Sequence, residues 1–216
     1  MDGASSPSLL VNMSNCKDPA QDKDFNHWYD KIHIPEVLNT KVYHAATRFK
    51  NAAPKPEEAH YLALYESTWH DPVAASNEMR KRAGSMNISP LLEGKYRRVF
   101  KRISDFPAKS GPYTSHRTTG VLVVLTTCND PAREAEFNKW YDTVHVPERI
   151  ETGCIYAAAR YAIADPQPGD AKFLAVYETD AKDPAAAIAK MPGLIKQPTT
   201  RFDNFTVAFV ATFLRI

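Results

Sequence analysis

Short apolar runs alternate with amphipathic stretches along the chain, and the same order occurs twice. Apolar runs bounded by turn residues predict buried strands at residues 9–13, 43–49, 60–66 and 96–103, and again at 121–125, 156–161, 172–178 and 205–214. After the first strand of each half, aromatic residues recur at helical spacing. Asp71-Pro72 and Asp183-Pro184 each begin an alanine-rich second helix. Each half therefore predicts the order β-α-β-β-α-β, the ferredoxin-like arrangement of an α+β fold.

The two halves are copies of one another at a shift of 112 residues. Between Leu10 and Met79, 31 of 70 aligned positions are identical without a gap. A repeat of this length is too long for a solenoid unit, so it predicts two units of one fold. We expect a first ferredoxin-like α+β barrel unit at residues 8–104, a linker at 105–117 rich in Pro, Gly and Ser, and a second unit at 118–216.

Each predicted sheet is antiparallel and carries helices on one face only, so its other apolar face must be covered. Two tandem units packed sheet to sheet cover both apolar faces within one chain. The predicted fold is therefore an intrachain dimer of α+β units, with space for a ligand between each sheet and its helices. Because the fusion completes the structure, no second chain is needed, although a homodimer stays open.

Composition and charge exclude several classes of partner. The formal charge is only +2 and the third strands lack the aromatic RNP1 pattern, so we expect no nucleic-acid partner. The basic run at 95–102 is typical of a strand with one solvated face. No apolar run is long enough to span a membrane and no signal peptide precedes the first strand, so we expect no membrane partner. Three cysteines without a framework fit a reduced, cytoplasmic protein.

The strongest motif is FNxWYDxxHxPE, at residues 25–36 and 137–148. On the first helix of a βαββαβ unit it resembles the dimeric α+β barrel superfamily, and within it the EthD-like group. The core from Trp to Pro also resembles the equivalent helix of bacterial chalcone isomerase. The resemblance implies one pocket per unit beside this helix. It also implies compact aromatic or carbonyl substrates, and many members need no cofactor, although some handle haem.

The motif histidines, His33 and His145, are the candidate acid–base groups, because imidazole titrates near neutral pH. In the chalcone isomerase resemblance, the motif histidine serves as acid or base. At helical spacing, a Tyr and an Asp of the motif lie on the face of each histidine, where the phenol could polarise a substrate oxygen and the carboxylate could fix the imidazole tautomer. These further catalytic candidates are Tyr29, Asp30, Tyr141 and Asp142. The alternative is structural: imidazolium and carboxylate could stabilise the helix end, which the proline weakens near Ile34.

Five further side chains are candidates for substrate binding, and each also has a structural interpretation. They are Trp28, Trp140, His44, Tyr65 and Arg48. The tryptophans could belong to the core, and Arg48 could pair with Glu66, as Arg160 could with Glu178. If only one pocket is active, we favour the first, because His44 adds an imidazole that the second copy lacks. His-x-x-Glu supplies too few ligands per copy for a closed metal site, so we expect no metal.

These residues favour a cofactor-independent enzyme that moves a proton next to a carbonyl group, with no cofactor bound. The predicted reactions are isomerisation, cyclisation, decarboxylation or elimination of a small hydrophobic carbonyl or aromatic substrate. One alternative is a haem- or O₂-dependent monooxygenase of the same fold, with His70 as a candidate axial ligand. Another is a binding or scaffold protein without turnover.

Overall fold

The computed structural model describes residues 1–84, 86–107, 116–196 and 199–216. Each half has four strands and two helical regions, in the predicted order. The strands are β1 (Ser8–Cys16), β2 (Ala45–Asn51), β3 (Tyr61–Ser67), β4 (Leu92–Phe106), β5 (Gly120–Cys128), β6 (Ala157–Ile163), β7 (Phe173–Thr179) and β8 (Phe205–Arg215). The helices are α1 (Asp22–Trp28), α2 (Ile34–Asn39), α3 (Pro72–Ala83), α4 (Glu134–Trp140), α5 (Val146–Glu151) and α6 (Pro184–Lys190).

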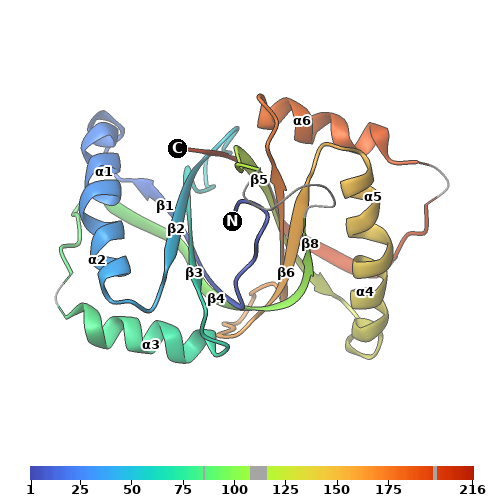
Figure 1. Cartoon of the computed structure of the whole chain (residues 1–216), viewed down its shortest axis with the longest axis horizontal. Helices are drawn as coiled ribbons and strands as arrows, with labels where there is room; N and C mark the ends of the chain where they lie inside the picture. The colour runs from blue at the N-terminus through green and yellow to red at the C-terminus, as the bar shows by residue number, and fades with distance from the viewer. Residues whose placement is uncertain (85, 108–115, 197–198) are drawn as a thin grey trace.

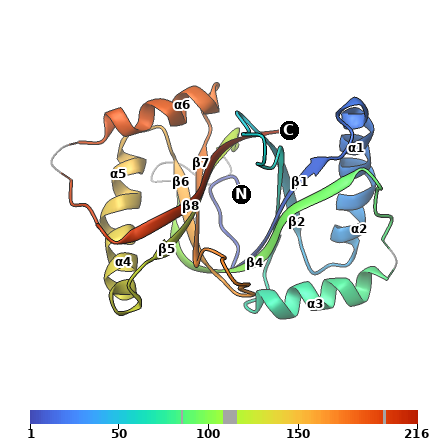
Figure 2. The same cartoon turned by 180° about the vertical axis from the view of Figure 1, so that it is seen from behind.

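The eight strands close into one barrel in the order β1-β3-β2-β8-β5-β7-β6-β4. Each half contributes four neighbouring strands, and the halves join edge to edge, antiparallel, at β2·β8 and β4·β6. This confirms the predicted α+β fold of two ferredoxin-like units in one chain. Figure 1 shows α1, α2 and α3 on one outer side of the barrel and α4, α5 and α6 on the other, and Figure 2 shows the same arrangement from behind.

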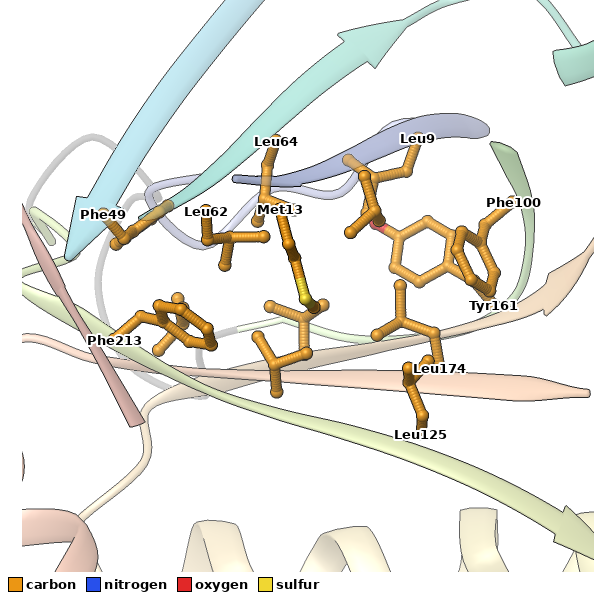
Figure 3. Packing of buried hydrophobic residues seen from close by; sticks show 14 of the residues in the cluster. Leu9, Met13, Phe49, Leu62, Leu64, Phe100, Leu125, Tyr161, Leu174 and Phe213 are labelled. Carbon is orange, nitrogen blue, oxygen red and sulfur yellow. The ribbon is translucent and has the colours of Figure 1, made fainter. Parts of the chain in front are cut away.

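The barrel interior is a hydrophobic core to which both halves contribute (Figure 3). Leu64 and Phe100 of the first half and Leu174 and Phe213 of the second half all belong to this core, and each is fully buried. Burying each such side chain contributes about 1.5–3 kcal/mol, so this shared core holds the halves together. Two further cores lie under the helices, one in each half. The space for a ligand must therefore lie outside the barrel, between the sheet and the helices.

The strand β4 continues beyond the expected start of the linker. Asp105 and Phe106 pair with Ala159 and Ala158 of β6, so they help to close the barrel. Residues 108–115 of the expected linker lie outside the described residues. The division at 8–104, 105–117 and 118–216 stays a prediction.

The motif helix is not a uniform α-helix. Between α1 and α2 the backbone forms a π-helical turn, η2 (Tyr29–His33), and the second copy has the equivalent turn η5 (Tyr141–His145). Proline cannot donate to the preceding turn and its ring crowds the carbonyl there. The wider π turn accommodates Pro35 within the first turn of α2, so the helical backbone continues to Asn39. The weakening expected near Ile34 is therefore a change of helix type and not an end.

Candidate functional site

The π turn determines which side chains lie beside the motif histidine. Because hydrogen bonds in a π turn run from i to i+5, residues five apart come into line. The ring of His33 stacks on Trp28 with centroids 4.9 Å apart, and His145 packs on Trp140 at 4.6 Å. The tryptophans also fix a loop in each half, since Trp28 Nε1 donates to Asn87 O and Trp140 Nε1 donates to Thr200 O, both at 2.8 Å. Trp28 lies in the core, whereas Trp140 also lines a cavity.

The motif aspartates do not orient the histidines. Arg48 Nη1 donates to Asp30 Oδ1 at 2.8 Å, and Arg160 Nη1 donates to Asp142 Oδ1 at 2.6 Å. Both arginine side chains are buried, with 2 % and 1 % exposed, and their guanidinium carbons lie 4.2 and 4.1 Å from the ring centres of Tyr29 and Tyr141. Asp30 and Asp142 therefore neutralise buried cations, and Arg48 lines neither the cavity at His33 nor the cavity at His145.

The expected pairing of Arg48 with Glu66 is also wrong, and the strand register explains why. Glu66 lies opposite Ala45, whereas Arg48 lies opposite Ala63, three positions away. Because side chains alternate between faces, Arg48 points toward the helices and Glu66 toward the other face of the sheet. There Glu66 accepts a hydrogen bond from Ser6 Oγ at 3.1 Å.

The candidate tyrosines form a hydrogen-bonded pair in each half. The Tyr65 hydroxyl donates to Tyr29 at 3.4 Å, and Tyr177 donates to Tyr141 at 3.2 Å. Burial raises the pKa of all four phenols, so they stay neutral. Tyr65 lines a cavity, whereas Tyr29 and Tyr141 are enclosed below the surface and do not line one.

The first-half cavity has a volume of about 590 Å³ and lies between the sheet and α2, α3 and the segment after α3. His33 and Tyr65 reach it, together with Asn12 and Arg97 from the strands and Arg80 from α3. The remaining walls are mostly apolar. They are Leu10, Val37, Met79, Ala83, Gly84, Met86, Ile88, Leu92 and Gly94. His44 is exposed and lies away from this cavity, near Ser6, so the reason for favouring the first half does not hold.

The second-half cavity has a volume of about 450 Å³ and lies beside α5 and the segment that leads to β8. His145 reaches it, and aromatic rings dominate its apolar wall. Two arginines and one acid complete the charged part. The lining residues are Trp140, His145, Glu148, Arg149, Pro192, Ile195, Thr199, Thr200, Arg201, Phe202 and Phe205. Both volumes fall in the range of about 300–1,000 Å³ that small-molecule sites occupy.

Both motif histidines are neutral at neutral pH. Burial lowers the pKa of His145 to about 2, and the guanidiniums of Arg149 and Arg160 act in the same direction. Burial also lowers the pKa of His33, although the carboxylate of Glu36 opposes part of that shift. A base whose conjugate acid is so unstable accepts a proton poorly, which argues against acid–base catalysis by His145.

The sequence did not single out the arginines at the cavities, Arg80, Arg97, Arg149 and Arg201. For Arg97 a signal was present: in the run from 95 to 102, Arg97 alternates with Val99, which faces the helices, so the charge falls on the covered face of the sheet. His70, the expected axial ligand, is exposed and lines neither cavity. In the described part of the chain, no group of three or more His, Cys, Asp or Glu side chains could hold a metal ion.

Comparison with known proteins places the fold. No protein-family model matches the chain. A chlorite dismutase from Candidatus Nitrospira defluvii, solved with imidazole, covers 97% of this chain and 92% of its own, with 9% identity and a TM-score of 0.58. A dye-decolorizing protein from V. cholerae covers 98% and 94%, with 11% identity and a TM-score of 0.58. These likenesses confirm the ferredoxin-like dimeric α+β barrel fold.

One curated relative matches part of the sequence. Core atranone cluster protein 1 of Stachybotrys chlorohalonatus is 38% identical over 63 residues, which are 29% of this chain. The chain matches about a quarter (26%) of the length of that relative. No helix among the described residues is long and apolar enough to cross a membrane.

The expectation of a cofactor-free acid–base enzyme is contradicted. The structural neighbours, chlorite dismutase and dye-decolorizing proteins, are haem-dependent enzymes, and isomerase or lyase activity has no support among them. The geometry agrees: the aspartates that were expected to orient His33 and His145 bind Arg48 and Arg160 instead.

Proposed function

We propose that the protein is a haem-dependent enzyme and that the second-half cavity holds the haem through His145. The observation that carries this proposal is an imidazole that reaches a cavity and stays unprotonated, since its pKa is lowered to about 2. In the described part of the chain, neither ring nitrogen of His145 makes a hydrogen bond. Histidine is a common axial ligand of haem iron, and it binds a metal in its neutral form.

The rest of the cavity has the chemistry that a haem requires. A haem presents a flat apolar macrocycle and two carboxylates. Trp140, Phe202 and Phe205 supply flat apolar walls, and Arg149 and Arg201 supply two guanidiniums. Arg201 is exposed, so a carboxylate that meets it remains near water and avoids the cost of burying a charge.

Hydrogen bonds join the walls of this cavity to its histidine helix. Trp140 Nε1 donates to Thr200 O at 2.8 Å, and Thr199 Oγ1 donates to Glu148 Oε1. These bonds hold the segment before β8 close to the motif helix, where its residues line the cavity together with His145. When bound, a haem would supply redox chemistry with peroxide or oxygen.

The first-half cavity suits a haem less well. Arg97 lies on its floor, half-buried among apolar side chains. The lining of this cavity offers a flat macrocycle the ring of Tyr65, whereas the second-half cavity offers the rings of Trp140, Phe202 and Phe205. The copies are therefore not equivalent as haem sites, although each has a motif histidine.

Several finer expectations belong to this proposal. A small apolar carbonyl or aromatic substrate is one of them, and the largely apolar walls of the two cavities support it. The EthD-like resemblance rests on the motif FNxWYDxxHxPE. A cytoplasmic location and a homodimer of the fused chain also stay predictions.

Titration of the purified protein with hemin tests the proposal, with the Soret absorbance as the readout. We expect saturation at one haem per chain and a spectrum that differs from that of free hemin. His145→Ala should change the spectrum, and added imidazole should restore it, because the cavity remains. Iron-free protoporphyrin IX should bind the wild type and His145→Ala alike, since it needs no axial ligand.

The matched control is His33→Ala, which removes the equivalent histidine of the other copy. We expect its hemin spectrum to match that of the wild type. If His33→Ala changes the spectrum and His145→Ala does not, the assignment to the second-half cavity is wrong. If hemin keeps its free spectrum with the wild type, the haem proposal itself is wrong.

A further inference from the structure

The floor of the first-half cavity carries a charge that the fold does not neutralise. Asn12 of β1 and Arg97 of β4 lie directly opposite one another in the sheet, and both line the cavity. Arg97 Nη2 donates to Ser76 Oγ of α3 at 3.2 Å. Among the described residues, no carboxylate forms an ion pair with Arg97.

A second guanidinium lies near the first. Arg80 of α3 is exposed and lines the same cavity, and its Nη1 donates to Asn77 Oδ1 at 3.3 Å. Burial lowers the pKa of Arg97, and the like charge of Arg80 lowers it further. The negative charge of Asp165 acts in the opposite direction and raises the pKa of Arg97. However, Asp165 Oδ1 accepts a hydrogen bond from the backbone N–H of Val99 at 2.9 Å. The cavity therefore contains two adjacent cations and a shortage of negative charge.

Two arginines that are buried more deeply than the half-buried Arg97 are neutralised within the fold. Arg48 and Arg160 each bind a carboxylate, at 2.8 and 2.6 Å, and each also binds an asparagine oxygen. A guanidinium in an apolar setting ordinarily has such a partner. Among the described residues no carboxylate binds Arg97, which indicates that a ligand supplies the carboxylate.

The second half shows that the fold itself does not need this charge. The pair that corresponds to Asn12 and Arg97 in the β5·β8 register is Val124 and Val210. Two valines complete the same point of the sheet there. The polar pair is therefore a feature of the first-half cavity that the corresponding point of the second half does without.

We propose that the first-half cavity binds an amphipathic organic carboxylate, with its headgroup on Arg97 and Arg80. The planar fork of a guanidinium matches a carboxylate in bidentate geometry. Six apolar side chains form the walls that would receive the rest of the molecule. They are Leu10, Val37, Met79, Met86, Ile88 and Leu92. The volume of about 590 Å³ accommodates a ligand with a sizeable apolar part.

Isothermal titration calorimetry with haem-free protein tests this proposal, with decanoate as the probe and decan-1-ol as its uncharged match. We expect decanoate to bind the wild type at least ten times more tightly than decan-1-ol. Arg97→Met should weaken decanoate binding roughly 10- to 100-fold, because it removes charge-assisted hydrogen bonds. Binding of decan-1-ol should not change, which separates loss of the headgroup site from collapse of the cavity.

The matched control is Lys101→Met, which removes an exposed charge from the same strand outside the cavity. It should bind decanoate like the wild type, and Arg80→Met should show a loss in the same direction as Arg97→Met. Equal affinity of the wild type for decanoate and decan-1-ol would overturn the proposal, as would unchanged decanoate binding by Arg97→Met. Because no haem is present, failure of the haem proposal leaves this result unaffected.

Discussion

Lowering the pH from 7 to 5 should destabilise the fold through the imidazole of His145. Burial lowers the pKa of this group to about 2 in the folded protein, from an ordinary value of 6.5. Because the folded-state pKa is lowered, the stabilisation is present above pH 6.5 and is lost as the pH falls from 6.5 toward 2. At pH 5 the imidazole of His145 is protonated in the unfolded chain but remains neutral in the folded chain. A gap of about 1.5 pH units corresponds to about 2 kcal/mol of unfolding free energy.

Urea unfolding of the wild type and His145→Gln at pH 7 and pH 5 measures this term. Glutamine is polar and does not titrate, so the contributions of all other titrating groups cancel when the two proteins are compared. The wild type should lose about 2 kcal/mol more than the variant between the two pH values. His33→Gln should show a smaller difference, because Glu36 partly offsets the lowered pKa of His33. Equal losses in the wild type and His145→Gln would refute the reasoning.

Two further predictions concern packing and buried charge. Gly120→Ala should lower the free energy of unfolding by about 1–3 kcal/mol, because a Cβ there would lie 2.5 Å from Pro184 Cβ and 2.9 Å from Phe213 O. Thermal denaturation measures this loss, and the control is Gly94→Ala, whose added Cβ would have no atom within 4 Å. Asp142→Ala should lower the free energy of unfolding in urea by about 3 kcal/mol, because it leaves the buried Arg160 without its carboxylate. Glu136→Ala breaks an exposed ion pair and should lower it by under about 1 kcal/mol. A loss for Asp142→Ala no larger than that for Glu136→Ala would contradict the second prediction.

The fold could be predicted because its signals are local and repeated. Strand runs, helix starts at Asp-Pro and the 112-residue repeat all agree, and each copy supports the interpretation of the other. The packing of the two units against each other could be predicted because the second apolar face of each sheet has to be covered. Asp71 and Asp183 cap α3 and α6 as the sequence indicated, by accepting backbone N–H groups of the first turn.

The site could be predicted only in part. Which side chains meet there depends on the type of helix at the motif and on the face of the sheet to which each strand residue points. His33, His145, Trp140 and Tyr65 do line the cavities. The aspartates were misplaced because α-helical spacing was assumed, whereas the π turn brings the tryptophan five residues back onto the histidine. The expected acid–base role relied on the same spacing: the aspartates that were to orient the histidines bind Arg48 and Arg160 instead.

Joining two copies of one fold in a single chain has a consequence for how the cavities can change. In a pair of identical chains, every substitution occurs at two symmetric positions at once. Here a codon change alters one copy only, while the shared barrel of β1 to β8 still closes around the core. Arg97 can therefore coexist with Val210 at the equivalent point of the other half. One gene thus carries two cavities whose linings can change independently of one another.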